Sequence, residues 1–564
     1  MEQLGAMHWA DYVLICFYLS LMLAVGVYFS RYIKELKDYY RGGNRMPWWV
    51  AGLSAYMTTF SAFAFVGVAS VAYTHGFTIA FMYWSCTVGF VLGARFLAAR
   101  WRRSNVTTPP EYLEERFNLP VSQLLAWTYV PIRSIDNGMR LYSMSIFLGV
   151  ATGLDLRVTI ITAGIVVILY TMLGGVWAVA VTDVIQFIVL TVAILIVLPL
   201  SIVAVGGFSG FISGSPPGFF SPTNGPYDWW YIGGFAVFSI LAYAGNWPVA
   251  QRYYSVPDDR DAKKAGYLAS ALSLTSPILW CIPPMAARQI LPHLTNPEMA
   301  YVALCLKMLP IGMVGLVLAA MFAATASALD SEYNMLSGVL TSNVYIRFFR
   351  PEASDRHRLL VGRLTTVLVG TFTIIMAMFV PKLGGAFQTL VKNFGLSAPP
   401  TLIPFIWGML YRRTPPLGVI LTFVLGLSTG IVLNFVVGAS WGIATLGNAA
   451  VCVAVMSLSG WLFPMKGEGK TRVDKFFERI TSPLPKAEVR GKSEDGPSPF
   501  YITGVVCLAT GISLVPLSLI PQSSLNSSLT LSAAAVLMGL GYLMWRSHRR
   551  SSRVNSLDGD APVS

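Results

Sequence analysis

Apolar stretches recur along nearly all of the 564-residue sequence and limit what the chain can fold into. Each is roughly 20 residues long, enough to cross the roughly 30 Å hydrocarbon core of a bilayer as a helix. Only 12% of the residues are charged, whereas a soluble chain carries about 25%. So few charges cannot solvate the surface of a soluble protein of this length. The sequence therefore predicts an all-α polytopic membrane protein.

The pattern of apolar stretches predicts about 15 transmembrane helices. They are expected at residues 8–30, 47–73, 78–99, 122–150, 158–173, 180–206, 229–250, 266–290, 309–343, 360–380, 388–411, 416–437, 442–464, 500–521 and 528–546.

The basic residues predict the orientation of these helices. With the N-terminus outside, 31 of the 40 Lys and Arg residues fall in cytoplasmic segments, and Arg157, Lys307 and Lys382 are the only ones in outside loops. Cytoplasmic loops carry such an excess of positive charge. We expect a multi-pass protein of the plasma or inner membrane with a cytoplasmic C-terminus. Basic residues confined to short loops also argue against a nucleic-acid partner.

Two predicted helices are rich in glycine and polar residues. The helix at 47–73 contains Ser54, Thr58, Thr59 and Ser61, and the helix at 229–250 contains the sequence Gly245-Asn246-Trp247-Pro248. Such sequences are typical of helices that break at the membrane midplane around a substrate site. Alternatively, the hydroxyls bond to their own backbone or pack against neighbouring helices. Because the two helices lie five spans apart, they predict two inverted repeats.

This pattern divides the chain into four parts. Residues 1–465 are expected to form a core of one leading helix, two inverted five-helix repeats and two following helices. The repeats are expected at about 47–206 and 229–411. The polar stretch 466–499 predicts a flexible cytoplasmic linker. Beyond it, we expect two accessory helices within 500–546 and a disordered cytoplasmic tail at 547–564.

Ionisable residues inside predicted spans mark a site or an ion pathway by default. Arg133, Asp136 and Arg140 are spaced three and four residues apart on one predicted helix. They can pair with each other, which leaves one positive charge. Asp330 lies in the span 309–343 on a polar helical face, which predicts either a wet pathway or a stripe buried between helices. The other members of that face are Ser327, Asn334, Ser337 and Thr341.

Three segments resemble the sodium/solute symporter family, over roughly residues 8–465. They are TPPEYLEERF at 108–117, GGVWAV at 174–179 followed by TDVIQ at 182–186, and Asn246 followed by Gln251-Arg252. The stretch 395–413 is also similar to the family. The resemblance implies an inverted-repeat transporter fold of the LeuT type and alternating access driven by a sodium gradient.

The resemblance also implies where sodium binds. One site uses the backbone carbonyls of Met57, Phe60 and Ala320, together with hydroxyls at positions where this chain has Ala323 and Ala324. Sodium is a hard cation that needs oxygen ligands, so these two methyl groups put the site in question.

A second sodium site in some members lies near Asp183 and Ser327, and one of its hydroxyl positions is Ala326 here. Asp330 stands where many members have a neutral polar residue, which makes it a candidate coupling residue.

Six positions correspond to residues that line the family's substrate site. They are Thr59, Ser61, Ala64, Asp136, Asn246 and Trp247. A small hydroxyl-lined pocket suits a sugar, an amino acid or a carboxylate. Either Arg133 or Arg140 would favour an anion if it faces the cavity.

We therefore expect a secondary active transporter that couples a cation, sodium, to the symport of a small polar solute. A proton-coupled or uncoupled transporter of the same fold, and a transporter-like sensor, are the alternatives. None of the five histidines pairs with a nucleophile in the sequence, so we expect no enzyme activity. Sodium as the coupling ion is the only cofactor expected, and the solute, the cation and the lipid bilayer are the expected partners.

Overall fold

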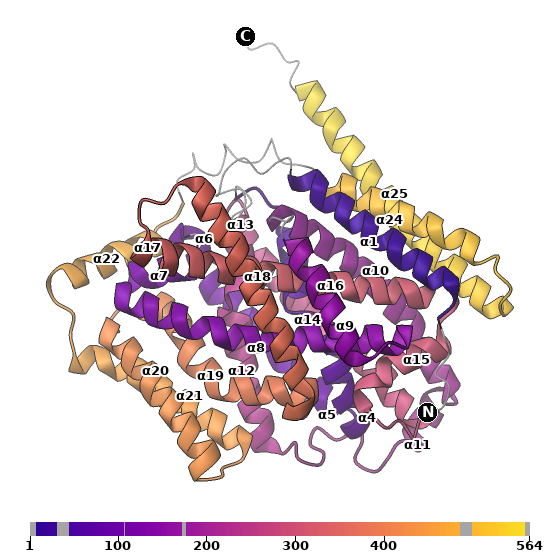
Figure 1. Cartoon of the computed structure of the whole chain (residues 1–564), viewed down its shortest axis with the longest axis horizontal. Helices are drawn as coiled ribbons and strands as arrows, with labels where there is room; N and C mark the ends of the chain where they lie inside the picture. The colour runs from indigo at the N-terminus through magenta and orange to yellow at the C-terminus, as the bar shows by residue number, and fades with distance from the viewer. Residues whose placement is uncertain (1–6, 31–43, 107, 172–175, 485–498, 559–564) are drawn as a thin grey trace.

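The computed structural model describes residues 7–30, 44–106, 108–171, 176–484 and 499–558. Helices make up nearly all of these ranges, in which no strand forms beyond an isolated bridge between Asn224 and Tyr227. This confirms the predicted all-α class. Figure 1 shows the helices packed side by side in one body, with α24 and α25 lying along its edge next to α1.

The helices before the loop at 214–228 come first in the chain. They are α1 (Trp9–Ser30), α3 (Trp48–Thr58), α4 (Ala69–His75), α5 (Thr78–Leu92), α6 (Ala98–Ser104), α7 (Pro109–Arg116), α8 (Leu119–Thr152), α9 (Leu156–Thr171), α10 (Val176–Ala204) and α11 (Gly207–Ser213). Short π-helical turns at Ala64–Val68 and Gly93–Leu97 lead into α4 and α6.

The part of the chain after this loop begins with another interrupted helix, α12 with α13. Its helices are α12 (Trp229–Gly245), α13 (Trp247–Ser255), α14 (Asp259–Ile290), α15 (Ala300–Met308), α16 (Met313–Gly338), α17 (Arg347–Phe349), α18 (Asp355–Phe379), α19 (Gly385–Leu410), α20 (Pro416–Ile431), α21 (Trp441–Leu462), α22 (Gly467–Thr481), α24 (Pro499–Leu517) and α25 (Ser524–Asp558).

Eleven of the described helical segments are long and apolar enough to cross a membrane. The other predicted spans correspond to α3 with α4, to α8, to α9 and to α19. Helices α8 and α9 meet at a bend of 119°, and α19 contains Pro399, Pro400 and Pro404. The polytopic class is thus confirmed, and the number of about 15 spans stays a prediction.

Both predicted helix breaks are present. After α3 ends at Thr58, the chain becomes helical again at Ala64. Asn246 is extended between α12 and α13, with φ −67° and ψ 136°, and Pro248 lies in the first turn of α13, where its missing N–H costs nothing. The hydroxyls of Thr58 and Thr59 donate to the carbonyls of Ser54 and Tyr56. The two interpretations of this segment therefore hold together: the helix breaks, and its hydroxyls bond to the backbone.

The segment TPPEYLEERF forms α7, which braces the end of α19. Thr108 and Glu111 form a capping box at the start of α7. The buried guanidinium of Arg116 donates to the carbonyls of Gly408 (2.9 Å) and Tyr411 (2.8 Å), which satisfies carbonyls that a helix end leaves free. Burial lowers the pKa of Arg116 to about 10, so it stays charged at neutral pH.

The structure corrects two predictions near the C-terminus. Within the predicted flexible linker 466–499, residues 467–481 form α22, which packs on α6 and α7. Val473, Phe476, Phe477 and Ile480 share one helical face and are buried there. The predicted disordered tail 547–564 is helical as far as Asp558, as part of α25. Residues 485–498 and 559–564 lie outside the described residues.

Candidate substrate and cation sites

A cavity lies between the two broken helices. It contains about 1110 Å³ of empty space, its mouth included. Thr59, Ser61 and Ala64 line it from the break after α3, and Asn246 lines it from the break after α12. Helices α5, α8, α12, α14 and α19 complete the wall. The two breaks thus border one cavity, as the repeat pattern predicted.

Five of the six predicted substrate-site residues line this cavity, and Trp247 does not. Thr59, Ser61, Ala64, Asp136 and Asn246 are all in its wall. The indole of Trp247 instead packs edge-on against Trp101, with ring centres 5.5 Å apart. Trp247 begins a new helix after the extended Asn246, which turns its side chain away from the cavity.

Aromatic rings form much more of the wall than the sequence predicted. Phe60 and Trp280 meet edge to face at 5.2 Å, and Phe238 stacks on Phe394 at 5.1 Å. The other aromatic residues in the wall are Tyr56, Phe63, Tyr83, Tyr129, Phe235 and Tyr243. A hydroxyl-lined pocket was expected, and the structure adds broad aromatic faces from helices far apart in the sequence.

The side-chain oxygen of Asn246 is buried, and it has no hydrogen-bond partner among the described residues. Asn246 itself lines the cavity. Buried polar atoms are nearly always bonded, so an unpaired one facing a cavity points to a ligand. A carbonyl oxygen can only accept. A group that bonds to this oxygen therefore has to offer a hydroxyl or an N–H.

Four charged side chains form a buried chain beside the cavity. Asp136 Oδ2 lies 3.2 Å from Arg133 Nη1 and 3.4 Å from Arg140 Nε, so the predicted pairing within α8 is present. Arg133 also makes a bidentate contact with Glu332 of α16. The sequence analysis missed Glu332, although it lies two residues after Asp330 in the same apolar span. Its carboxylate cancels the positive charge that pairing within α8 leaves.

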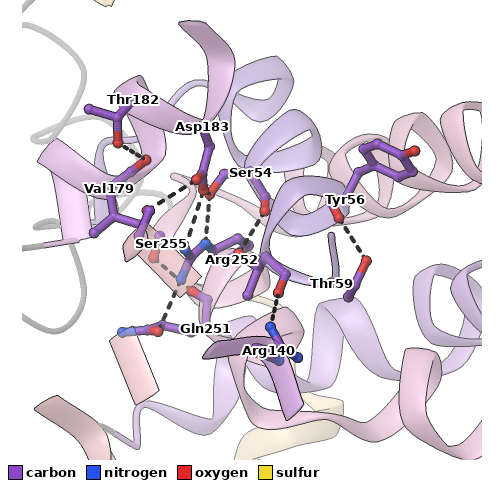
Figure 2. A network of polar contacts seen from close by, with 12 residues as sticks. Ser54, Tyr56, Thr59, Arg140, Val179, Thr182, Asp183, Gln251, Arg252 and Ser255 are labelled. Atoms are coloured by element: carbon purple, nitrogen blue, oxygen red, sulfur yellow. Dashed lines mark hydrogen bonds and ion pairs between the residues drawn. The ribbon is translucent and has the colours of Figure 1, made fainter. Parts of the chain in front are cut away.

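Asp183 belongs to a second buried cluster (Figure 2). This cluster includes Ser54 of α3, which lies about one helical turn before the break. The carboxylate of Asp183 accepts hydrogen bonds from Ser54 (2.6 Å) and Ser327 (3.3 Å). Arg252 Nη2 lies 3.7 Å from the same carboxylate, and Arg252 Nε donates to Ser54 at 2.9 Å. Four elements thus meet here: α3, α10, α13 and α16. The cluster brings the predicted pair Asp183 and Ser327 together around an arginine.

Arg252 was expected in a cytoplasmic segment after a helix ending at residue 250. The break at Asn246 restarts the helix, so α13 continues to Ser255 and carries Arg252 inward. Its side chain is 1% exposed and that of Asp183 is 4% exposed. The Arg252 guanidinium therefore lies beside the carboxylate of Asp183, at which the second sodium site was expected.

At the first expected sodium site, the carbonyl of Met57 accepts a hydrogen bond from the backbone N–H of Phe60 (2.9 Å). Ala320 is fully buried in α16. Ala323 lines an apolar crevice beside α1 and α9. The hydroxyl of α16 that reaches the broken helix is Thr325, which accepts from the N–H of Ala62 at 2.9 Å. The sequence analysis did not single out Thr325.

Asp330 is fully buried on α16. Asn334 donates to its Oδ1 at 2.8 Å, and Asp330 takes part in none of the ion pairs of the described residues. Further along the same face, Thr341 hydrogen-bonds to Thr365 of α18. These contacts favour the interpretation of the stripe as one buried between helices.

The family is settled by a comparison with known proteins. A model of the sodium:solute symporter family matches residues 39–426, more than half of the chain. The chain belongs to this family. It is therefore a multi-pass symporter of the plasma membrane rather than an enzyme, and membership implies sodium as the coupling ion.

Individual relatives agree with this assignment. The chain is 27% identical to a sodium/glucose cotransporter of Vibrio parahaemolyticus, over 74% of this chain and 83% of that one. It is also 27% identical to a sodium/sialic acid symporter of Proteus mirabilis, over 76% and 90% of the two chains. Residues 174–175, which begin the family segment GGVWAV, lie outside the described residues.

A solved structure of a sodium-coupled sialic acid symporter, substrate-bound and open to the outside, is similar in fold. The TM-score is 0.71 at 25% sequence identity, over 81% of this chain and 98% of that one. The predicted inverted-repeat fold of the LeuT type is thus confirmed.

Proposed function

We propose that this symporter carries a neutral polyhydroxy solute, a sugar or a polyol. The observation that carries the proposal is the Asn246 oxygen, which has no partner among the described residues, in a cavity whose buried charges cancel. The oxygen needs a donor such as a hydroxyl. A neutral wall gives a carboxylate no net attraction, because Arg133 and Arg140 are offset by Asp136 and Glu332.

The aromatic wall supports the same class of solute. Sugars and cyclic polyols present C–H faces, which pack on aromatic rings, and a rim of hydroxyls, which need polar partners. Thr59, Ser61 and Thr401 supply hydroxyls in the wall. Among the relatives are transporters named for glucose and for myo-inositol. A sugar that carries a carboxylate is the second candidate, since relatives named for sialic acid exist and Arg140 lines the cavity.

Two cations are candidates for the coupling ion of this chain. Sodium is supported by the family, whose first sodium site would use the carbonyls of Met57, Phe60 and Ala320 here. Against strong sodium binding stand Ala323 and Ala324, which lack hydroxyls, and Arg252, which already neutralises Asp183. A proton is supported by Asp330, a buried carboxyl with no counter-charge among the ion pairs of the described chain.

We expect Asn246→Leu and Thr59→Val to weaken uptake of the solute while the protein still folds. Each removes a polar group from the cavity and leaves its partner on the solute unbonded, at about 1–3 kcal/mol. This corresponds to a loss of about 5- to 150-fold in apparent affinity. Uptake of a panel of radiolabelled sugars, polyols and sugar acids by proteoliposomes measures the loss and identifies the solute.

Thr128→Val is the matched control, because its hydroxyl bonds to its own helix at Leu124 and lies outside the cavity wall. Unchanged kinetics in both cavity variants would remove this cavity as the solute site. A panel in which only sugar acids are taken up would select the second candidate instead.

We also propose an N-terminus outside and a cytoplasmic C-terminus. The distribution of Lys and Arg supports this orientation. In Figure 1, α4, α11 and α15 lie at one side of the body, and α6, α7, α17 and α22 lie at the opposite side. The second group precedes or adjoins the loops richest in Lys and Arg, which we therefore place in the cytoplasm.

Cysteine labelling tests this orientation. A membrane-impermeant maleimide should label Ser213→Cys in intact cells and should label Ser482→Cys only after the cells are opened. Both positions are exposed, and the one exposed native cysteine of the described chain, Cys16, is first replaced by alanine. Labelling of Ser482→Cys in intact cells would reverse the orientation.

A further inference from the structure

Glu332 influences the cavity without touching it. Its side chain is 3% exposed and lies behind Arg133, and it is not among the residues that line the cavity. Arg133, Asp136 and Arg140 do line the cavity. The four side chains alternate in charge in the order Glu332, Arg133, Asp136, Arg140. Glu332 is the one member supplied by α16, and the other three come from α8.

Within this row of four charged side chains, one carboxylate oxygen pairs with two guanidinium groups. Asp136 Oδ2 faces both Arg133 Nη1 and Arg140 Nε. Arg133 does not need all of Asp136, because Glu332 holds it through two hydrogen bonds from Nε and Nη2. Asp136 is thereby free to neutralise Arg140. The only other contact seen for the Arg140 guanidinium in the described chain is a long one, 3.5 Å from Nη1 to the carbonyl of Thr58.

Loss of the Glu332 charge changes which carboxylate neutralises which arginine. Arg133 would then have Asp136 as its one carboxylate partner in this row, so a single carboxylate would face two buried arginines. A buried charge without a partner is strongly unfavourable. Arg140 lines the cavity and lies beside the end of α3 (Figure 2), and it would be the group left without compensation. An anionic solute could supply the missing charge.

We propose that Glu332 is a specificity-determining residue of this symporter. By neutralising Arg133, it keeps Asp136 on Arg140 and so excludes carboxylate-bearing solutes in favour of neutral ones. Glu332 is a positioning residue, because it acts through Arg133 and Asp136. This inference rests on the proposed neutral polyhydroxy solute and adds what selects it.

Substitution of Glu332 by glutamine tests the proposal. The probes are matched neutral and acidic sugars, glucose with glucuronate and galactose with galacturonate, and binding to purified protein is measured by thermal shift and isothermal titration. The wild-type protein should prefer the neutral member of at least one pair. In Glu332→Gln, the ratio of acid to neutral affinity should rise by about 10-fold or more, as expected for an uncompensated buried cation. An unchanged ratio would overturn the proposal.

Two further variants separate specificity from folding. In Arg133→Gln/Glu332→Gln, Asp136 and Arg140 remain as a neutral pair, so the preference for the neutral sugar should persist. If that variant also gains acid binding, charge division is not the cause and the proposal fails. Glu332→Asp keeps the charge on a shorter side chain and should give a smaller shift in the same direction. Where Glu332→Gln does not fold, absence of any shift in Glu332→Asp overturns the proposal.

The same measurements separate this inference from the proposed function. If wild-type protein binds only the acidic members, or binds none of the probes while transporting another class of solute, the neutral-solute proposal fails. If wild-type protein binds the neutral member and Glu332→Gln keeps the same ratio, the assignment of Glu332 alone fails.

Discussion

Arg252→Ala is expected to abolish uptake and to destabilise the protein by about 3–5 kcal/mol, the range measured when one partner of a buried ion pair is removed. The substitution leaves Asp183 buried without its counter-charge, with Ser54 and Ser327 as its remaining partners. It also removes the polar contacts of α13 with Ser54 of α3 and Asp183 of α10. Thermal unfolding in detergent measures the stability, and uptake by proteoliposomes measures the activity.

The double variant Arg252→Gln/Asp183→Asn is the control for this result. Neutral side chains of similar size remove both charges together, so neither charge is left buried without its partner. We expect the double variant to unfold near the wild-type temperature. If Arg252→Ala alone is as stable as wild type, the two side chains do not form an ion pair in the membrane-embedded protein.

Asp330→Asn is expected to abolish any dependence of uptake on a proton gradient and to leave solute exchange intact. An ionised carboxylate inside a membrane is costly unless it is paired, and no ion pair of the described residues includes Asp330. A proton is the simplest means of removing its charge. The amide mimics the protonated acid permanently, so it can still cycle with solute but can no longer take up or release a proton. Uptake into proteoliposomes with imposed pH or sodium gradients measures both properties.

Ala323→Ser/Ala324→Ser is the matched variant for sodium. It places hydroxyls at the two positions where the family's first sodium site has them, next to the expected carbonyl ligands Met57, Phe60 and Ala320. The new hydroxyl at position 323 has to turn from the crevice beside α1 and α9 to join them. Sodium dependence should become stronger in this variant, whereas its response to pH should not change. If Asp330→Asn transports with unchanged dependence on both gradients, Asp330 supports the packing of α16 and sodium alone drives uptake.

Local sequence was sufficient for the features that depend on local chemistry. The spans follow from apolar length, because a bilayer accepts only helices whose backbone groups bond internally. The breaks follow from glycine and from Pro248, which disturb a helix whatever surrounds it. The breaks predicted a site between the two helices, and the family resemblance predicted Asn246 in its wall. The pairing of Arg133, Asp136 and Arg140 followed from helical spacing alone.

Only the tertiary structure decided which distant groups meet. Glu332 lies 199 residues from Arg133 in sequence, and no local pattern states that α16 presents it to α8. Arg252 was visible in the sequence, but its burial beside Asp183 depends on how α13 restarts and packs. The aromatic wall has the same origin.

For α22, an amphipathic face was present in the sequence, yet burial of that face required α6 and α7 as partners.

In a membrane, interhelical pairing carries no apolar signature, because lipid and protein interiors are equally apolar. The sequence by itself therefore determined that this chain is a membrane protein with two broken helices around a cavity. The packing of those helices decided which charges cancel there.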